Sequence, residues 1–418
     1  MKYNYKEKNF EKCGFIGGKK EIENHFKLCG FIKYQCIFCK EDILQIDLKE
    51  HVKNKCKFTI INYSNGNIYI GEKNNNLKEG YGIFNFINGD KYEGEWKNDL
   101  IEGYGIYNFT NGEKYEGEWK NDLKEGYGIF YFINGDKYEG EWKNDLKEGY
   151  GIYYFTNGEK YEGEWKNDLK EGYGIYFYSN ENIYEGEWKN NLKDGHGIMF
   201  FADGTRFEGE WKNGLKDGFG IEYAANGIFY KGFFKNGNAE GYGIMYFKEG
   251  GRYEGEWKNS NKEGFGIEYY YSGGRIYGEY KNGLINGIAI FNYSQGGRYE
   301  GEWKNDEREG YAKEYLCNGN VYEGEIKNGF GDGYGICYNQ NGDIFEGEFK
   351  KGNPIGYGIF YSSLGFKIEW YFKGTKLEIF LESIYTAFLF LNKLYSIVLR
   401  NKMTILFIII LIIGILIN

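Results

Sequence analysis

The sequence has a single proline and only three histidines among 418 residues, but 65 glycines. Helices tolerate frequent glycine poorly, so this composition disfavours a generic α/β enzyme. Aromatic residues make up 20% of the chain and hydrophobic residues 41%, which is enough apolar material to exclude wholesale disorder. Strands connected by glycine-rich turns are therefore the expected structure.

No basic and apolar leader opens the chain, because residues 1–12 are polar and mixed in charge. We therefore expect no secretory signal and a body that stays in the cytosol. Five of the seven cysteines lie before residue 57, where thiols or metal ligands are expected rather than disulfides. The charge is uneven, since residues 59–373 hold 35 Lys and Arg against 51 Asp and Glu, a balance of −16.

A repeat of 23 residues fills the middle of the chain. Tyr-Glu-Gly-Glu-Trp-Lys at Tyr92 recurs in phase, either identical or with substitutions. Thirteen units, from the weaker copy at Tyr69 to the one at Phe345, run without an insertion or deletion. Eight of the nine tryptophans occupy one position of this unit. A tandem array of this kind should derive its stability mainly from contacts between neighbouring repeats.

Each repeat is predicted to form a β-hairpin. Tyr161, Gly163 and Trp165 alternate with charged residues, a period of two that places rings on one face of a strand and charges on the other. Residues 167–171 are expected to form a turn, and residues 172–178 a second strand. At about 4.8 Å a strand, 26 strands would give a twisted sheet of roughly 125 Å.

Glycine is expected to serve two purposes in these hairpins. Asn-Gly pairs such as Asn157-Gly158 should reverse the chain tightly between repeats, because both residue types tolerate positive φ. Gly94, Gly103 and Gly105 lie inside the strands, where we expect them to make room for the large rings of neighbouring strands.

The aromatic stripe and the charged stripe each allow two interpretations. The tyrosines and tryptophans are expected to form the core, but an exposed aromatic groove for a peptide or helix is the alternative, with Trp119, Trp142 and Trp165 as its candidate residues. Glu118 and Lys120 represent the charged stripe, which should be a solvated face with cross-strand ion pairs. Its alternative use is to bind cations or a basic partner.

The motif Tyr-Glu-Gly-Glu-Trp-Lys-Asn followed by Gly-Tyr-Gly resembles the MORN repeat (membrane occupation and recognition nexus) over about residues 62–373. The resemblance implies an elongated, twisted run of antiparallel hairpins, in agreement with the periodicity. MORN arrays have been linked to phosphoinositides and anionic membranes. The acidic charge of this array disfavours direct lipid binding, because an anionic leaflet attracts clustered Lys and Arg.

A zinc site is predicted before the repeats. Three thiolates and one imidazole have spacings that can close a tetrahedron around Zn²⁺, namely Cys36, Cys39, His51 and Cys56. A weaker set repeats the eleven-residue step from cysteine to histidine without a first cysteine: Cys13, His25 and Cys29. This half either binds metal with three ligands, is a packing remnant, or continues a chain that starts further upstream.

Residues 13–56 resemble a pair of TRAF-type zinc fingers, the first of them incomplete. The resemblance implies a module that binds proteins. Nucleic acid is not expected as a partner, because the positive charge of this segment is modest and no recognition-helix arginine is present.

An apolar run without any charge covers residues 403–417. As a helix it would be about 22 Å long, and local thinning of the bilayer would let it span a membrane. Residues 377–399 have the pattern of an amphipathic helix that either lies in the membrane interface or caps the last repeat. We therefore expect a tail-anchored protein in an intracellular membrane, with its body in the cytosol.

These features predict a non-catalytic scaffold or adaptor with four parts: a zinc finger in 1–58, about thirteen repeats in 62–373, an amphipathic helix in 377–399 and a membrane anchor in 403–417. No catalytic motif is present, and the repeats leave no room for a catalytic domain. One alternative is a junctophilin-like tether between membranes, and another is a phosphoinositide-binding regulator. A third is a regulatory protein that shares only its repeats with MORN-containing lipid kinases.

Overall fold

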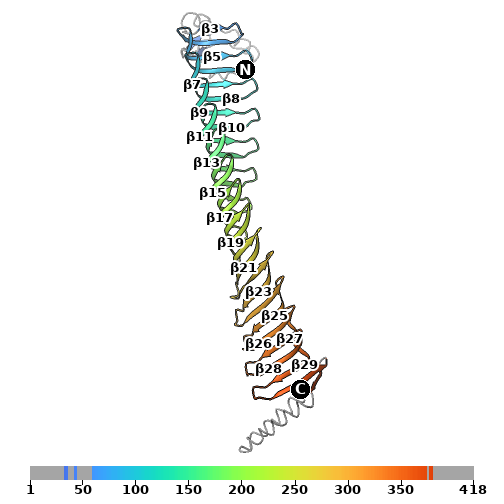
Figure 1. The fold of residues 1–418 in the computed structure, drawn as a ribbon. Coiled ribbons are helices and arrows are strands. Elements are labelled where there is room, and N and C mark those ends of the chain that lie inside the picture. Colours follow the sequence, from blue (N-terminus) through green and yellow to red (C-terminus); the bar gives the residue numbers. More distant parts are fainter. Residues whose placement is uncertain (1–32, 36–41, 45–58, 374–375, 380–418) are drawn as a thin grey trace, which may run out of the picture. The chain divides into compact units, whose positions relative to one another are not determined.

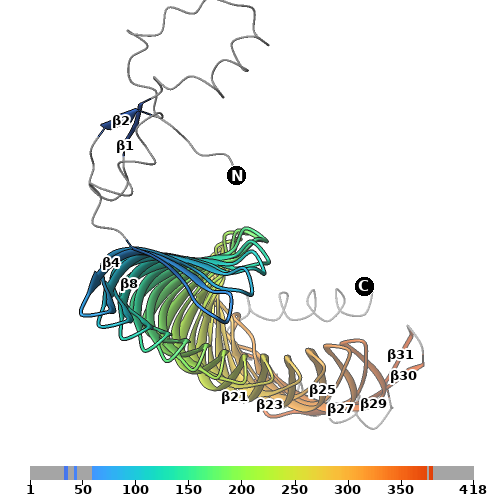
Figure 2. The ribbon, with the colours of Figure 1, turned by 90° about the horizontal axis from the view of Figure 1, so that it is seen from above.

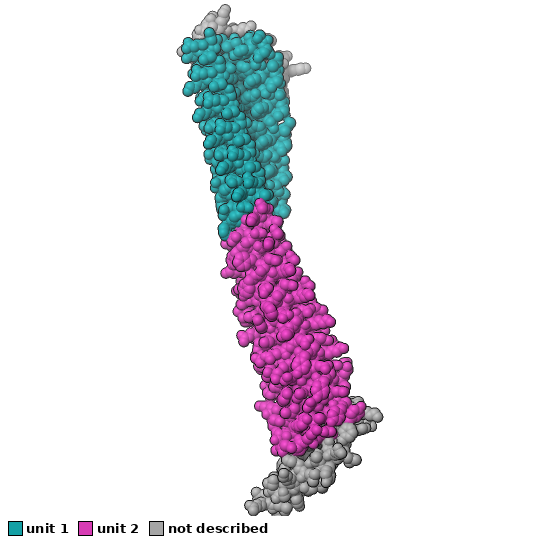
Figure 3. All heavy atoms as spheres, viewed as in Figure 1, with its two compact units in different colours: residues 1–202 teal, residues 203–418 magenta. Residues whose placement is uncertain are grey.

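A computed structural model of the chain describes residues 33–35, 42–44, 59–373 and 376–379. These residues contain 31 strands and no helix, which confirms the prediction of a mainly β protein for this part of the chain. The chain divides into two compact units, residues 1–202 and residues 203–418, coloured separately in Figure 3. Each unit is described by itself.

The first unit contains a short antiparallel pair and a longer ladder. β1 (Lys33–Gln35) pairs with β2 (Asp42–Leu44). In the ladder each strand is hydrogen-bonded to the strand that follows it in the chain, and all pairs are antiparallel (Figure 1). Its strands are β3 (Thr59–Asn62), β4 (Ile68–Asn74), β5 (Leu77–Asn85), β6 (Lys91–Lys97), β7 (Leu100–Asn108), β8 (Lys114–Lys120), β9 (Leu123–Tyr131), β10 (Lys137–Lys143), β11 (Leu146–Tyr154), β12 (Lys160–Lys166), β13 (Leu169–Phe177), β14 (Ile183–Lys189) and β15 (Leu192–Phe200).

The second unit is a ladder of the same kind, in which consecutive strands again pair antiparallel. Within each unit the successive hairpins are fanned out when viewed along the stack, as expected for a twisted sheet (Figure 2). The strands of this unit are β16 (Arg206–Lys212), β17 (Leu215–Tyr223), β18 (Phe229–Lys235), β19 (Asn238–Tyr246), β20 (Gly251–Lys258), β21 (Asn261–Tyr270), β22 (Arg275–Lys281), β23 (Leu284–Asn292), β24 (Arg298–Lys304), β25 (Glu307–Tyr315), β26 (Val321–Lys327), β27 (Phe330–Tyr338), β28 (Ile344–Lys350), β29 (Asn353–Tyr361), β30 (Lys367–Lys373) and β31 (Lys376–Ile379).

Two kinds of turn alternate along each ladder, and the tighter one is not where the sequence analysis placed it. Asn167 and Asp168 have φ of 47° and 68°, so these two residues alone reverse the chain, as in a type I′ turn. β13 therefore starts at Leu169, and the five-residue turn predicted for residues 167–171 is wrong. Asn and Asp tolerate this backbone conformation better than other residues with a side chain.

The Asn-Gly pairs lie in the longer loops between repeats. In the loop before β12, the Gly158 N–H donates a hydrogen bond to the Phe155 carbonyl at 3.1 Å, and Gly158 has a φ of 88°. A three-residue loop closed by one left-handed glycine is a common way to join antiparallel strands. The chain does reverse at Asn157-Gly158, but only the glycine needs positive φ there.

Pairs of glycines on adjacent strands leave the space that the buried tyrosine rings occupy. Gly94 pairs with Gly105 across β6 and β7, and a Cβ on either residue would overlap with the hydroxyl end of Tyr92. The steric role predicted for these two glycines is confirmed. Gly103 differs, because it has a φ of 64° and faces the Glu95 carboxylate instead of a ring.

Candidate functional site

The two faces of each ladder carry different side chains, as the repeat of β10 and β11 shows. Tyr138 and Trp142 alternate along β10 with the half-buried Glu139 and the exposed Glu141. We call the face of Tyr138 and Trp142 the core face, and the face of Glu139 and Glu141 the carboxylate face. A two-residue shift in pairing between Gly140 and Trp142 brings Lys147 of β11, in place of Gly149, opposite Trp142 on the core face.

Aromatic rings form a continuous row along the core face of the first unit. The Trp165 ring meets Tyr138 and Tyr161 edge-on, at centroid distances of 5.4 and 5.2 Å. Its Nε1 donates a hydrogen bond to the Gly151 carbonyl at 3.2 Å. Edge-to-face aromatic pairs add stability beyond the area that they bury. The row therefore stabilises each repeat on the next.

The three tryptophans considered for an exposed aromatic groove belong to this row. Trp119, Trp142 and Trp165 are 7%, 6% and 5% exposed, so their rings are core residues. Each indole lies against the tyrosine of its own repeat and the tyrosine of the preceding repeat. These contacts bury the rings from both sides and leave them unavailable as a partner surface.

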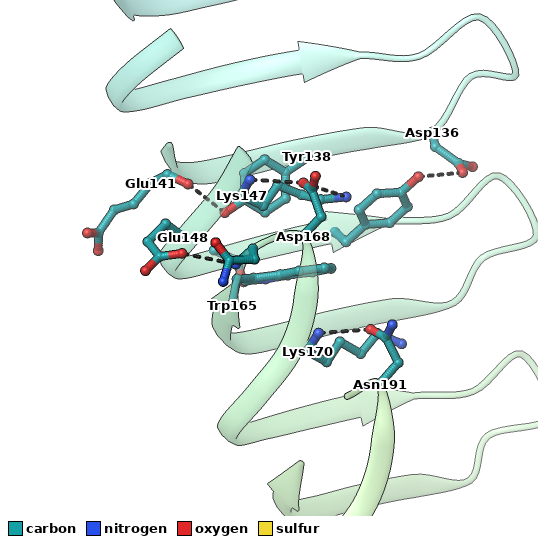
Figure 4. A network of polar contacts seen from close by, with 12 residues as sticks. Asp136, Tyr138, Glu141, Lys147, Glu148, Trp165, Asp168, Lys170 and Asn191 are labelled. Carbon is teal, nitrogen blue, oxygen red and sulfur yellow. Dashed lines mark hydrogen bonds and ion pairs between the residues drawn. The ribbon is translucent and has the colours of Figure 1, made fainter. Parts of the chain in front are cut away.

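A lysine is packed among the rings of the core face. The ammonium of Lys147 lies 4.8 to 5.8 Å from four ring centroids, an arrangement that we call the lysine cage: Phe132, Tyr138, Tyr153 and Trp165. Oδ1 of Asp168 lies 3.9 Å from the same ammonium and accepts the Lys147 backbone N–H at 2.9 Å (Figure 4). Burial lowers the pKa of Lys147, and Asp168 opposes this shift. In this cage the ammonium interacts with the faces of the aromatic rings and with one carboxylate.

The carboxylate face carries the exposed aromatic residues that the sequence analysis missed. The middle residue of the Gly-Tyr-Gly motif lies on this face, and at four consecutive repeats of the first unit it is a tyrosine that is 49 to 55% exposed. We call these four residues the tyrosine row: Tyr104, Tyr127, Tyr150 and Tyr173. Neighbours in the row are two strands apart, about 9.6 Å at the usual strand spacing. The signal was present in the sequence, because alternation places the middle residue of Gly-Tyr-Gly opposite its two glycines.

Hydroxyl groups of the tyrosine row are hydrogen-bonded to glutamates, and lysines pair with some of these glutamates. The Tyr150 hydroxyl donates a hydrogen bond to Oε1 of Glu162 at 3.0 Å, and the Lys160 ammonium lies 2.9 Å from Oε2 of the same carboxylate. Lys160 and then Tyr150 lower the pKa of Glu162, whereas burial and Glu162 raise the pKa of Tyr150. At neutral pH Tyr150 is therefore a neutral phenol beside an ionised carboxylate that is already paired with one lysine. Tyr173 donates to Glu185 in the same way, but Ile183 stands at the position of the lysine.

The other glutamate of each first strand is engaged with the backbone. Oε1 of Glu118 accepts the backbone N–H of Tyr127 at 3.2 Å, at the point where the pairing of β8 and β9 shifts. Lys120 follows it but does not pair with it across strands. The ion pair on this strand joins Lys114 to Glu116, two residues apart, so the expected cross-strand pattern is wrong here.

The predicted zinc ligands and the membrane anchor lie outside the described residues. These are Cys36, Cys39, His51 and Cys56, the weaker set Cys13, His25 and Cys29, and the segments 377–399 and 403–417, of which only residues 377–379 are described as part of β31. Within the described ranges no group of three or more His, Cys, Asp and Glu side chains is placed to hold a metal ion. The same ranges contain no helix long and apolar enough to cross a membrane. Cys317 is exposed and Cys337 half-buried, and both are free thiols.

The repeats match a known family. Thirteen segments, which together make up more than half of the chain, match the MORN repeat: residues 69–91, 92–114, 115–137, 138–160, 161–183, 184–206, 207–228, 230–252, 253–275, 277–298, 299–321, 322–344 and 345–363. The number of repeats predicted from the sequence is confirmed. No match was found among the curated proteins.

Solved structures resemble the chain only distantly. The wild-type TCP10 domain of CPAP from Danio rerio is 16% identical with a TM-score of 0.29, over 47% of this chain and 93% of that domain. The TCP domain of SAS-4 (dCPAP) from Drosophila melanogaster, in complex with a proline-rich motif of Ana2, is 15% identical with a TM-score of 0.24, over 42% and 89% of the two chains. At these values neither similarity supports an argument about function.

Proposed function

Because the chain belongs to the MORN repeat family, we propose that it is a non-catalytic scaffold whose repeats bind a protein partner along the tyrosine row. The observation that carries the proposal is the presence of half-exposed tyrosines at four consecutive repeats, all on one face. Tyrosine is enriched at protein interfaces because a rigid ring buries a large area and its hydroxyl still finds a partner. A single exposed ring needs no explanation, but a periodic row of rings is a continuous contact surface.

The charge of the same face indicates the chemistry of the partner. Residues 59–373 carry a balance of −16, and glutamates flank each tyrosine of the row. Lysine or arginine side chains of a partner would interact with these carboxylates, and guanidinium groups would also stack on the phenol rings. We therefore propose a basic segment of a partner protein as the ligand, with an affinity that falls as salt is added.

The test compares two full-length variants. In the first, the four tyrosines of the row are replaced by serine. In the control, Tyr271→Ser removes an aromatic side chain that is 82% exposed in a loop of the second unit. Partners are captured with the wild-type chain, and the enriched protein is then purified and titrated against all three chains.

We expect the row variant to weaken binding at least about tenfold, since several rings that the partner would cover are lost together. The Tyr271→Ser control should bind as the wild type does. Equal affinity for all three chains, with circular dichroism showing intact strands, would exclude the tyrosine row as the binding surface.

The segments outside the described residues extend this proposal. We propose that residues 403–417 anchor the scaffold in an intracellular membrane, on the basis of their uncharged apolar composition. Removing 403–418 should move a tagged chain from the membrane fraction to the supernatant after carbonate extraction. Identical fractionation of both forms would exclude the anchor.

We also propose that Cys36, Cys39, His51 and Cys56 bind one Zn²⁺ and form a finger for a second protein contact. Cys39→Ser should lower the bound zinc, measured by elemental analysis of the purified chain. Cys317→Ser is the matched control, because Cys317 is an exposed free thiol of the repeats. An unchanged zinc content in the Cys39→Ser chain would show that these residues are not the site.

A further inference from the structure

One lysine cage of the second unit has lost its lysine and contains a cavity instead. The cavity has a volume of about 260 Å³ and lies between β21 and β25. Its walls include the counterparts, six repeats further along, of the residues that surround Lys147: Tyr270, Ile276, Ile285, Phe291, Trp303 and Asp306. Ile285 takes the position of the lysine, so no ammonium of the described residues occupies the centre of the cage.

Two further replacements accompany the loss of the lysine. Ile276 stands where the other cages have a tyrosine such as Tyr138, and Ala289 stands where they have a glycine such as Gly151. The Ala289 methyl group lies against Gly278, in the place that a tyrosine ring covers elsewhere. An isoleucine is smaller than a tyrosine, and this difference in volume opens the cavity.

The ring faces and the carboxylate of the cage remain. Tyr270 and Phe291 are in edge-on contact at 5.8 Å. The buried Nε1 of Trp303 has no hydrogen-bond partner among the described residues, whereas the corresponding Trp165 donates to a carbonyl. Oδ1 of Asp306 accepts the Ile285 backbone N–H at 2.7 Å, as Asp168 does for Lys147. Among the described residues, Asp306 has no ion pair, although Asp168 has one.

The other charged groups at the cavity neutralise each other. The Lys262 ammonium lies 2.6 Å from Oε2 of Glu268, and the Tyr280 hydroxyl donates to the same oxygen at 3.4 Å. Lys262 also lies over the Tyr253 ring at 4.8 Å, in the cage of its own repeat. Asp306 is therefore the unpaired charge at the cavity, and it is negative.

We propose that this cavity binds an organic cation, an alkylammonium group that replaces the missing lysine ammonium. Aromatic faces attract cations, and three rings with a carboxylate at the edge are the usual setting for a methylated ammonium. Drug-sized ligands need pockets of roughly 300 Å³ or more, so a volume of about 260 Å³ favours a small head group. The group belongs either to a free choline-like molecule or to a methylated lysine of a protein.

The decisive variant restores the resident lysine. Ile285→Lys should rebuild the cage, fill the cavity and compete with any added cation. Ile101→Lys is the matched control in the first unit, where Ile101 also replaces the lysine but Tyr92 and Gly105 are retained and Trp119 donates to Gly105 at 3.4 Å. Asp306→Asn removes the carboxylate charge and leaves the shape nearly unchanged.

The full chain, purified in a non-ionic detergent, is titrated with choline and with its uncharged analogue that has carbon in place of nitrogen. Saturation-transfer NMR and calorimetry report binding. We expect the wild type and Ile101→Lys to bind choline alike, Ile285→Lys to bind at least about tenfold more weakly, and Asp306→Asn several-fold more weakly. Peptides with trimethyllysine or plain lysine then distinguish a protein side chain from a free molecule as the natural source.

Three results would overturn the proposal. One is equal binding of choline and its neutral analogue, which would mean that charge does not matter in the cavity. The second is choline binding by Ile285→Lys at the wild-type level. The third is no binding of choline and of the trimethyllysine peptide by the wild type at about 10 mM, a concentration that detects even weak association.

Discussion

The backbone N–H of Lys170 donates a hydrogen bond to Oδ1 of Asn191 at 2.8 Å, at the position where the preceding repeat pairs Lys147 with the carboxylate of Asp168 (Figure 4). The asparagine keeps the hydrogen bond of the turn but supplies no charge. Burial lowers the pKa of Lys170 to about 8, with Glu159 opposing this shift. A single side-chain change in the neighbouring turn thus separates two otherwise equivalent buried lysines.

Asn191→Asp should raise the pKa of Lys170 and stabilise the first unit by roughly 1 kcal/mol at neutral pH, because it gives the ammonium a carboxylate partner. Since the folded pKa of about 8 lies below the ordinary lysine value of 10.5, the unfolded chain binds more protons between these values. Titration of Lys170 therefore raises the free energy of unfolding of the wild type as pH rises through this window.

The measurement is urea unfolding of the wild type and Asn191→Asp at about pH 7 and about pH 10, on either side of most of the Lys170 titration. Other titrating groups are common to both chains and cancel in the difference. The advantage of the variant should shrink as pH rises. An advantage that stays constant would mean that Asn191 does not control the Lys170 charge.

Gly151→Ala should destabilise its repeat by about 1–3 kcal/mol, because the added methyl group overlaps with the Tyr138 ring. Ala312, which lies one strand from Tyr299, shows that the fold accommodates alanine at this position of the repeat. We therefore expect a folded but less stable chain. Thermal unfolding of the single and double variants measures the effect.

The double variant Tyr138→Ile with Gly151→Ala reproduces the natural pair Ile276 and Ala289. The double variant should lose less unfolding free energy than the two single variants lose in total, by at least about 1 kcal/mol, since the smaller side chain makes room for the methyl group. Strictly additive losses would contradict the steric account of the glycine.

Asp145→Ala should cost about 1–2 kcal/mol. Asp145 has a φ of 68°, which alanine adopts poorly, and its Oδ1 accepts the Lys124 backbone N–H at 2.9 Å. Asp145→Asn is the control, because asparagine tolerates the same backbone conformation and accepts the same hydrogen bond, as Asn191 does. Asp145 also pairs with the Lys124 ammonium at 3.2 Å, so chemical denaturation should show a smaller loss for the asparagine variant than for the alanine variant. Equal losses for both variants would refute this account of the turn.

Trp165→Ala should cost about 3–5 kcal/mol, whereas Tyr150→Ala should cost less than about 1 kcal/mol. The Trp165 side chain is 5% exposed and the Tyr150 side chain is 50% exposed, although the two residues lie on adjacent strands. Hydrogen exchange around β11 and β12 would show the loss of protection for the first variant. A large loss for Tyr150→Ala would mean that the tyrosine row is part of the core and not a free surface.

Much of the fold could be predicted because the pattern is repeated. Thirteen in-phase copies of one motif average out local ambiguity, so the hairpins, their strand pairing and the seats of Gly94 and Gly105 followed from period-two alternation. The turns were harder, because Asn-Asp and Asn-Gly are both turn formers and only the backbone shows which pair has positive φ at both residues. The position of Lys147 was missed because of the simple rule that lysine is exposed. Alternation from Gly151 places Lys147 on the core face, and the pairing shift after Gly140 brings it opposite Trp142.

The amino-acid sequence by itself determined the repeat, its hairpin and its family, because these depend on short-range alternation within 23 residues. Only the tertiary structure decided which aromatic residues are buried and which are exposed. In a ladder of hairpins a ring is covered by side chains one strand or one repeat away, so Trp165 is enclosed by two tyrosines while Tyr150 remains half-exposed. The cavity beside Ile285 depends in the same way on side chains from four neighbouring strands, β21 to β24, whose combined volume no single repeat reveals.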